Sequence, residues 1–305
     1  MSITLTILGC HSATPRENAH PTSQIVSIKN HTFLVDCGEG TQVQLRKYSI
    51  KFNKIKHIFI SHLHGDHFYG LIGLISTFRL LNRETELHIY APKGLKEIIT
   101  LQLKLSKSWT QYPLLFHELD STKSEIIFED EKVSVQTIPL SHRIYTNGFL
   151  FKEKLGERKL NMEAIAKYPD IKICDYQNLK NGRDFKLENG TILKNEKVTL
   201  EPNKPLSYAF CSDTEYLPEI KTIIKKVDTL YHESTFLNDK EALAKTTKHS
   251  TAQQAAEIAK MAQVKNLIIG HFSSRYKNKN DFLTEAKNVF KNTVLAEEGK
   301  VFEIK

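Results

Sequence analysis

The alternation of short, apolar, β-prone runs with amphipathic stretches is the feature that most constrains the fold of this 305-residue chain. Runs rich in Ile, Val, Phe and Tyr predict strands, and stretches with apolar residues at helical spacing predict helices. We expect strands at residues 4–8, 24–28, 32–36, 57–61, 87–91, 132–140, 206–212, 229–232 and 265–270. We expect helices at residues 41–48, 69–81, 93–105, 216–226, 251–261 and 281–290. This alternation indicates a layered α/β architecture.

A cluster of metal-ligand side chains follows the strand expected at residues 57–61. His62, His64, Asp66 and His67 stand within six positions, and Gly65 between them permits a tight turn. His62 and His64 would lie on the same side if the extended geometry of the strand continues. Deprotonated imidazole and carboxylate groups bind metal ions. A polar surface loop is the alternative interpretation, but this spacing is rare by chance, so we predict a metal site at a strand-to-helix turn.

Three further candidate ligands occupy a similar position in the sequence. His142, Asp213 and His271 each come at the end of an apolar, β-prone run, as His62 does. Ligands at the ends of several strands converge on one edge of a sheet, where the sites of layered α/β folds gather. Each residue alone is more often an ordinary polar residue at a strand end. Together with the first cluster they predict a site built from several strand ends.

The remaining histidines and the cysteines give weaker signals. The other histidines show no partner pattern and are expected at the surface or in local hydrogen bonds: His11, His20, His31, His57, His88 and His117. The four cysteines are far apart and form no Cys-x-x-Cys pair. They therefore indicate neither a disulfide framework nor a zinc site built from thiolates.

Residues 151–204 interrupt the alternation. This segment is polar, contains Pro169, Pro202 and three glycines, and carries 12 basic and 9 acidic residues. Such a stretch would not add a layer to a core, so we expect an inserted arm or a long loop. A surface insertion without a role is the alternative.

The charge and hydropathy of the chain limit its partners. A net charge of +8 and a pI of about 9.1 are compatible with an anionic partner without identifying one. No stretch approaches the roughly 18 apolar residues that a membrane span needs. The N-terminus lacks the basic start and the apolar run of a signal peptide. We therefore expect a cytoplasmic protein without membrane association.

The heptapeptide at 61–67, Ser-His-Leu-His-Gly-Asp-His, resembles the metal motif of the metallo-β-lactamase superfamily. Other stretches resemble one branch of it, the short form of ribonuclease Z, the tRNA 3′-processing endonuclease. These stretches are residues 8–15, 34–42, 141–142, 211–214, 231–235, 249–251 and 270–276, in the order of that family. The first motif is specific for the superfamily only. Asp-Cys-Gly-Glu-Gly-Thr-Gln at 36–42, His-Glu-Ser-Thr at 232–235 and His-Phe-Ser-Ser-Arg-Tyr at 271–276 select the branch.

The resemblance implies a metallo-β-lactamase fold over residues 1–305, an αββα four-layer sandwich with an inserted projecting arm. It also implies a homodimer and two zinc ions (Zn²⁺) per subunit. In this family pattern, one zinc ion would be held by His62, His64 and His142. The other would be held by Asp66, His67 and His271. Asp213 would bridge the two ions, and Asp36 would orient the ligand loop.

The resemblance further implies a reaction. The chain would remove the 3′ trailer of precursor tRNA by attack of a metal-activated hydroxide on a phosphodiester, leaving a 3′-hydroxyl on the tRNA. Asp66 would accept a proton from the attacking water. His249, held by Glu233, would protonate the leaving oxygen, although an ordinary surface histidine is the alternative for His249. The substrate phosphate would be bound by Ser274, Arg275 and Tyr276.

The family arm that grips tRNA lies between the third and fourth ligand motifs, where this chain has residues 151–204. The family pattern has a Gly-Pro pair at a glycine-rich arm tip, whereas this chain has Ile-Cys-Asp-Tyr-Gln-Asn-Leu-Lys-Asn-Gly at 173–182. A hydrolase of small phosphodiesters or sulfate esters on the same fold is the second hypothesis, and it has no need of a basic arm. A non-catalytic RNA-binding protein is the third, but it would not need all seven ligands and the His249–Glu233 pair.

Overall fold

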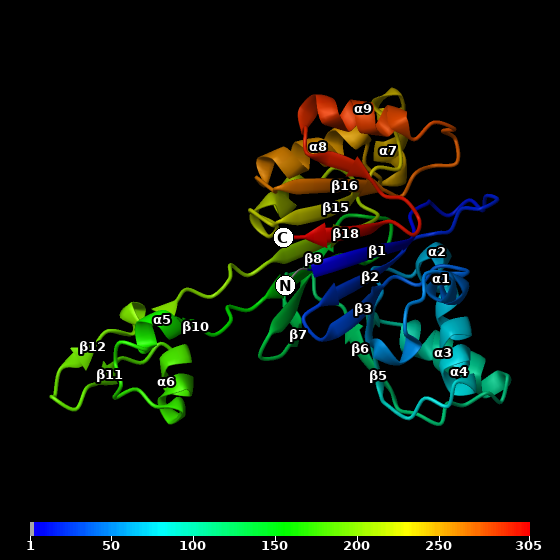
Figure 1. The fold of residues 1–305 in the computed structure, drawn as a ribbon. Helices are drawn as coiled ribbons and strands as arrows, with labels where there is room; N and C mark the ends of the chain where they lie inside the picture. Colours follow the sequence, from blue (N-terminus) through cyan, green and yellow to red (C-terminus); the bar gives the residue numbers. More distant parts are fainter. Residues whose placement is uncertain (1–2) are drawn as a thin grey trace. The chain divides into compact units, whose positions relative to one another are not determined.

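Two seven-stranded sheets form the centre of the computed structural model, which describes residues 3–305 (Figure 1). The chain divides into two compact units. The main unit consists of the residues up to Lys152 together with Leu206–Lys305, and the arm unit is Glu153–Pro205. No helix within residues 3–305 has both the length and the apolar character that a membrane crossing requires.

The first sheet has the strand order β18-β1-β2-β3-β4-β5-β6. Its strands are β1 (Ile3–Gly9), β2 (Ser23–Ile28), β3 (His31–Val35), β4 (Ile55–Phe59), β5 (Leu87–Pro92), β6 (Leu114–Leu119) and β18 (Val301–Ile304). Strands β3 to β6 run parallel to one another, so their carboxyl ends lie at one edge. The helices that follow these strands are α1 (Thr41–Lys47), α2 (Gly65–Phe68), α3 (Gly70–Leu80) and α4 (Leu95–Leu105). They bury Leu74 and Phe78 against Leu34 and Ile58 of the sheet.

The second sheet has the order β17-β16-β15-β14-β9-β8-β7. Its strands are β7 (Ile126–Glu129), β8 (Val133–Leu140), β9 (Thr146–Glu153), β14 (Ser207–Cys211), β15 (Thr229–Glu233), β16 (Asn266–Gly270) and β17 (Thr293–Leu295). Strands β14 to β17 are parallel. The helices of this half are α7 (Glu241–Thr247), α8 (Ala252–Met261) and α9 (Asn280–Val289). Helix α8 begins at a capping box in which Thr251 and Gln254 satisfy each other's backbone N–H groups.

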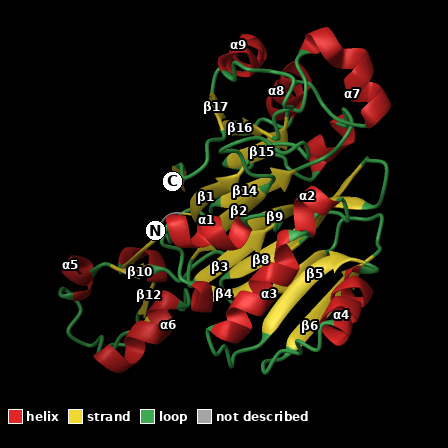
Figure 2. Ribbon diagram, turned by 90° about the vertical axis from the view of Figure 1, so that its right-hand side faces the viewer, coloured by secondary structure: helices red, strands yellow, loops and turns green. Residues whose placement is uncertain are grey.

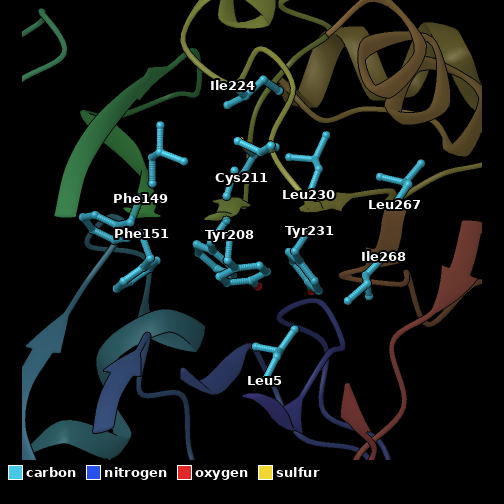
Figure 3. Packing of buried hydrophobic residues seen from close by; sticks show 14 of the residues in the cluster. Leu5, Phe149, Phe151, Tyr208, Cys211, Ile224, Leu230, Tyr231, Leu267 and Ile268 are labelled. Atoms are coloured by element: carbon cyan, nitrogen blue, oxygen red, sulfur yellow. The ribbon is translucent and has the colours of Figure 1, made fainter. Parts of the chain in front are cut away.

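Side chains of the second sheet alternate between two buried layers, as the period of a strand requires (Figure 3). Tyr208, Tyr231 and Ile268 point toward Leu5 of the first sheet. The side chains that point the other way, toward the helix layer, include Cys211, Leu230 and Leu267. Figure 2 shows the two sheets stacked with helices outside each of them. The predicted α/β fold with four αββα layers is therefore confirmed.

Most of the expected elements of the main unit form within a few residues of their expected bounds, but the helix expected at 216–226 is wrong. Only a short 3₁₀ helix, η4 (Pro218–Thr222), forms there. Three consecutive β-branched residues, Thr222, Ile223 and Ile224, lose rotamer freedom in an α-helix, and Lys226 then turns the chain with a φ of 58°.

The four histidines His31, His57, His88 and His117 are not scattered, contrary to the expectation from sequence. They come from the neighbouring strands β3, β4, β5 and β6 and form a row of rings across the first sheet. The ring centroids of His57 and His88 lie 4.9 Å apart, and those of His88 and His117 lie 5.2 Å apart, both stacked. His31 ends the row on the carboxylate of Asp130, with Nε2 and Oδ2 2.7 Å apart. The four histidines are far apart in the sequence, so the row could not be predicted before the strand pairing was known.

The arm unit has a small core of its own, made of Ile165, Ile171, Leu179, Leu193 and Val198. Its elements are β10 (Lys159–Leu160), α5 (Met162–Ile165), α6 (Tyr176–Lys180), β11 (Phe185–Lys186), β12 (Ile192–Leu193) and β13 (Thr199–Leu200), with the short 3₁₀ helices η2 (Ile173–Asp175) and η3 (Asn195–Lys197). The buried Asn195 amide donates to the carbonyls of Leu179 and Arg183 and so ties the two halves of the unit together. The unit begins two residues later than expected, because Phe151 and Lys152 still belong to β9.

Candidate metal centre

The predicted ligands stand where strands of both sheets end. His62 follows β4, His142 follows β8, Asp213 follows β14 and His271 follows β16 directly. All four side chains are buried in the main unit, as is His67 in the first turn of α2. Convergence of strand ends therefore brings together residues that are up to 209 positions apart in sequence.

One group of donors consists of His62, His64, His142 and Asp213. Nδ1 of His64 lies 3.0 Å from Nε2 of His62 and 3.2 Å from Nε2 of His142. Oδ2 of Asp213 lies 3.7 Å from Nε2 of His62 and 3.9 Å from Nε2 of His142. Three imidazole nitrogens and one carboxylate oxygen thus face a common point.

A second group consists of Asp66, His67 and His271. Nε2 of His67 lies 3.4 Å from Oδ2 of Asp66 and 3.3 Å from Oδ1 of Asp213. Nε2 of His271 lies 3.8 Å and 3.2 Å from the same two oxygens. Asp213 therefore turns one carboxylate oxygen toward each group, which is the geometry of a bridging ligand.

The donor set fits a metal ion. Within residues 3–305, Nε2 of His67 and Nε2 of His271 are buried without a hydrogen-bond partner. Buried polar atoms are ordinarily satisfied, so two such imidazole nitrogens aimed at two carboxylates indicate a site that can bind a cation. Nitrogen and oxygen donors without thiolate suit a divalent transition metal. Burial lowers the pKa of His142 to about 4, which leaves its Nε2 unprotonated and free to coordinate at neutral pH.

Asp36 and Ser61 hold the first motif in place. Asp36 directly follows β3 and has a left-handed φ of 55°, a conformation that is uncommon for a residue with a side chain. Its carboxylate accepts hydrogen bonds from Ser61 N–H at 2.7 Å, from Ser61 Oγ at 2.9 Å and from Nδ1 of His67 at 2.7 Å. Because Nδ1 of His67 donates to Asp36, Nε2 is left for the metal.

A backbone carbonyl performs the same task for His142. Nδ1 of His142 lies 2.7 Å from the carbonyl oxygen of Lys248, so the ring donates there and keeps Nε2 free. Lys248 ends α7 with a left-handed φ of 56°, which aims that carbonyl at the site.

The expected acid pair is also assembled. Nδ1 of His249 lies 2.8 Å from Oε1 of Glu233, the last residue of β15, and both side chains are buried. Burial alone would lower the pKa of His249, but the Glu233 carboxylate outweighs it and raises that pKa to about 9. The same attraction to His249 outweighs burial and lowers the pKa of Glu233 to about 2. The Glu233 carboxylate therefore favours the protonated form of His249, which stands beside the predicted metal ligands.

A cleft of about 400 Å³ opens onto these groups. Its lining includes His64, Asp66, Asp213 and His249, together with two arginines, Arg143 and Arg275. Ser274 and Tyr276 are not part of the lining, whereas Ser273 and Arg275 are. The phenol of Tyr276 is instead engaged with Asp239 at 2.8 Å and with the backbone N–H of Leu237 at 3.2 Å.

Comparison with known proteins places the chain in a family. It is 46% identical to "Ribonuclease Z" of Bacteroides fragilis over 97% of either chain. It is also 46% identical to "Ribonuclease Z" of Cytophaga hutchinsonii over 100% of this chain and 97% of that protein. The chain belongs to the ribonuclease Z family.

A solved structure agrees with this placement, and a model of another family matches the first half of the chain. The crystal structure of human tRNase Z, short form, superimposes with a TM-score of 0.73 at 28% identity and 99% coverage of both chains. The family model for anti-Pycsar protein Apyc1 matches residues 3–157. That match includes five of the seven predicted ligands but ends before Asp213, Glu233, His249 and His271.

Two residues of this ribonuclease Z chain lie at the site but carried no separate signal in the sequence. Thr235 contacts both Glu233 and His271, and Arg143 lines the cleft. The position of Thr235 in the His-Glu-Ser-Thr stretch was part of the family resemblance. Arg143 is the neighbour of a metal ligand, which is the one feature that singles it out.

Proposed function

We propose that this ribonuclease Z family member is an endoribonuclease that removes the 3′ trailer of precursor tRNA and leaves a 3′-hydroxyl. The observation that carries the proposal is the joining of two ligand groups by Asp213, with the His249–Glu233 pair on the same cleft. The relatives named ribonuclease Z and the human tRNase Z structure support the substrate. A cytoplasmic location, where precursor tRNA is available, is part of the same proposal.

The proposed cofactors are two zinc ions per subunit. His62, His64 and His142 would hold one of them, and Asp66, His67 and His271 the other. Asp213 would contribute one oxygen to each. When bound, such ions lower the pKa of coordinated water and neutralise developing charge on a phosphodiester.

Proton transfer is assigned to two residues of the chain. Asp66 lines the cleft and, besides its role as a ligand, accepts a proton from the attacking water. His249 is protonated at neutral pH and donates to the leaving ribose oxygen, while Glu233 keeps its Nδ1 side fixed.

The two arginines of the cleft suit the charge of the substrate. Arg143 and Arg275 have no carboxylate partner among the ion pairs of residues 3–305 and present guanidinium groups to the cleft. A guanidinium binds phosphate oxygens through paired N–H donors. We therefore propose that Arg275, one of the three residues predicted to bind the substrate phosphate, does so together with Arg143.

The arm unit is the proposed tRNA-binding element of residues 151–204. It exposes Lys167, Lys186 and Lys197, for which the structure gives no acceptor within residues 3–305. Cations of this kind bind RNA phosphates and release counterions, so the binding should weaken as salt rises. In a homodimer, the partner subunit would supply a second copy of the arm unit.

Exposed apolar residues of α1 and α3 support the homodimer. Val43 and Leu80 are each more than half exposed, with Leu80 at 81%, and both line one surface hollow. Apolar patches on a surface mark contacts with another protein. We expect Leu80→Asp to convert a dimer to a monomer in sedimentation, whereas Val301→Asp, at an exposed apolar residue of the edge strand β18, should not.

One experiment tests the function. Purified protein is incubated with a precursor tRNA that carries a 3′ trailer and, separately, with bis-p-nitrophenyl phosphate. The assay is repeated with Lys167, Lys186 and Lys197 changed to Ala. A matched control changes Lys56, Lys96 and Lys287, three exposed lysines of the main unit, to Ala.

We expect the arm variant to lose tRNA cleavage and keep turnover of the small ester, and the control to keep both. Arg275→Ala should raise KM for tRNA. If the unaltered protein hydrolyses the small ester but leaves the tRNA intact, the tRNA assignment fails and the small-substrate hydrolase takes its place.

A further inference from the structure

Thr235 lies at the centre of the second half of the site. It follows β15 by two residues and is buried, with 4% of its surface exposed. Its hydroxyl oxygen Oγ1 lies 2.6 Å from Oε2 of Glu233, 2.7 Å from Nδ1 of His271 and 3.2 Å from Nδ1 of His249. One hydroxyl thus touches a metal ligand, the acid and the carboxylate that holds the acid.

The geometry determines which neighbour accepts the hydrogen bond from the Thr235 hydroxyl. An ionised carboxylate only accepts hydrogen bonds, and a hydroxyl has a single proton to donate. The short contact with Glu233 therefore takes the Thr235 proton. Toward His271 the same oxygen can only accept, so Nδ1 of His271 must be the nitrogen that carries hydrogen.

This fixes the tautomer of His271. With hydrogen on Nδ1, the lone pair of Nε2 faces Asp213 and Asp66, at 3.2 Å and 3.8 Å. That nitrogen is one of the two orphaned imidazole atoms of the site. A hydrogen-bond partner behind a metal-binding histidine orients the ring and makes it a better donor.

Thr235 also limits the freedom of Glu233. Oε2 of Glu233 accepts from both the hydroxyl and the backbone N–H of Thr235, the latter at 3.0 Å. Oε1 accepts from the backbone N–H of Thr214 at 3.0 Å and from His249 at 2.8 Å. With Oε2 held, Oε1 stays on His249.

We propose that Thr235 is a positioning residue whose hydroxyl joins the metal ligand His271 to the Glu233–His249 pair, so that one side chain sets both metal retention and acid orientation. This inference rests on the proposed metal centre and goes beyond it, because it couples metal retention to the Glu233–His249 pair through a residue that is not itself a proposed metal ligand.

The test compares three variants of the full chain loaded with zinc. Thr235→Val removes the hydroxyl and keeps the shape, and Thr235→Ser keeps the hydroxyl. Ser234→Ala is the matched control, because the neighbouring Ser234 hydroxyl is equally buried but donates to the carbonyl of Gly270 at 3.1 Å. The rate of zinc release to a coloured chelator is measured beside kcat and KM for the precursor tRNA.

We expect Thr235→Val to release one zinc ion per chain about 10- to 100-fold faster, the range for loss of a group behind a metal ligand. Its kcat should fall while KM stays within about twofold, and Thr235→Ser should restore both. Ser234→Ala should match the unaltered protein. Unfolding of the metal-free proteins separates a general loss of stability from this effect, since Thr235→Val and Ser234→Ala should unfold at similar urea concentrations.

The proposal is overturned if Thr235→Val releases zinc at the unaltered rate, or if Ser234→Ala releases it as fast as Thr235→Val. Zinc release does not depend on the substrate. A protein that ignores tRNA but shows the expected release rates would therefore contradict the proposed function and leave the role of Thr235 standing.

Discussion

Each sheet supports the proposed metal centre with a carboxylate and a hydroxyl, but the order of the hydrogen bonds differs between the two sheets. In the first sheet, the Asp36 carboxylate accepts directly from the ligand His67, and the Ser61 hydroxyl donates to that carboxylate. In the second sheet, the Thr235 hydroxyl stands between Glu233 and the ligand His271. Asp36 and His271 both turn the chain in a left-handed conformation directly after a strand, with φ of 55° and 62°.

The difference shows how one site can hold metal and deliver a proton. Because Thr235 takes over the contact with His271, Oε1 of Glu233 can accept from His249 as well as from the backbone N–H of Thr214. Within residues 3–305, the Asp36 carboxylate accepts from Ser61 and His67 but from no second histidine. We infer that the first sheet supports metal binding alone, whereas the second supports metal binding and acid catalysis.

The largest loss of metal and activity should follow from changing Asp213, which faces both groups of proposed ligands. Asp213→Ala removes the oxygen that faces His62 and the oxygen that faces His67. We expect metal content to fall well below that of the unaltered protein and tRNA cleavage to fall to background, because neither group keeps its carboxylate bridge. Metal analysis by mass spectrometry checks this, with Asp239→Asn, which faces Tyr276, as the control. Full metal content in Asp213→Ala would contradict the bridging role of Asp213.

The second prediction separates the two sheets. His67→Ala should lose metal and activity together, because His67 is a proposed ligand whose Nδ1 contacts Asp36 and Ser61 and not the acid pair. His249→Ala should keep its metal and lose about 10²- to 10⁴-fold in kcat, the contribution of a general acid. Metal content and single-turnover rates distinguish the two. Loss of metal in His249→Ala would indicate that His249 is a metal ligand and would contradict the proposed difference between the two sheets.

The third prediction concerns pH. The Glu233 carboxylate raises the pKa of His249 to about 9, so the protonated acid is present below that pH and is lost as pH rises through it. Activity should therefore decline above about pH 9. Glu233→Gln removes the charge, lowers the pKa of His249 and moves this decline to lower pH.

Asp36→Asn is the matched change in the first sheet. It should weaken metal binding by about 10- to 100-fold, because the group behind His67 loses its charge. The alkaline decline should stay where it is, since Asp36 does not contact His249. Equal shifts of the pH profile in Asp36→Asn and Glu233→Gln would contradict the assignment of the acid to one sheet.

Much of this arrangement was predictable from sequence. A polar residue placed directly after a buried β-run indicates a strand-end ligand, and this pattern identified His142, Asp213 and His271. Convergence of strand ends then required only that the strands be parallel, which β14, β15 and β16 are. The helix expected at residues 251–261 likewise forms as α8, directly after the N-cap residue Thr251.

What sequence did not show depends on pairing across the fold. Thr235 and Arg143 are ordinary residues until the turn beyond β15 and the loop after β8 bring them to the cleft. The row containing His57 and His88 exists only because β4 and β5 pair in register. Strand β9 was missed because Gly148 interrupts its β-prone run, yet a Cβ there would lie 2.3 Å from the carbonyl oxygen of Phe210, which requires glycine.

The smallest expected effect tests whether backbone support differs from side-chain support. His142 is held by the carbonyl of Lys248, not by its side chain, so Lys248→Gly keeps the contact. Glycine relieves the left-handed φ of 56°, a strain of about 1–2 kcal/mol. It also adds chain freedom that costs about 0.5–1 kcal/mol and loses an exposed ion pair with Glu215 that contributes about 1 kcal/mol or less, so the effects largely cancel. We expect unfolding free energy to change by no more than about 1 kcal/mol, with metal content unaltered. Gln263→Gly, at a left-handed φ of 57° beyond α8, is the control for the backbone effect alone. Metal loss in Lys248→Gly but not in Gln263→Gly would mean that the Lys248 side chain is needed to aim the carbonyl at His142.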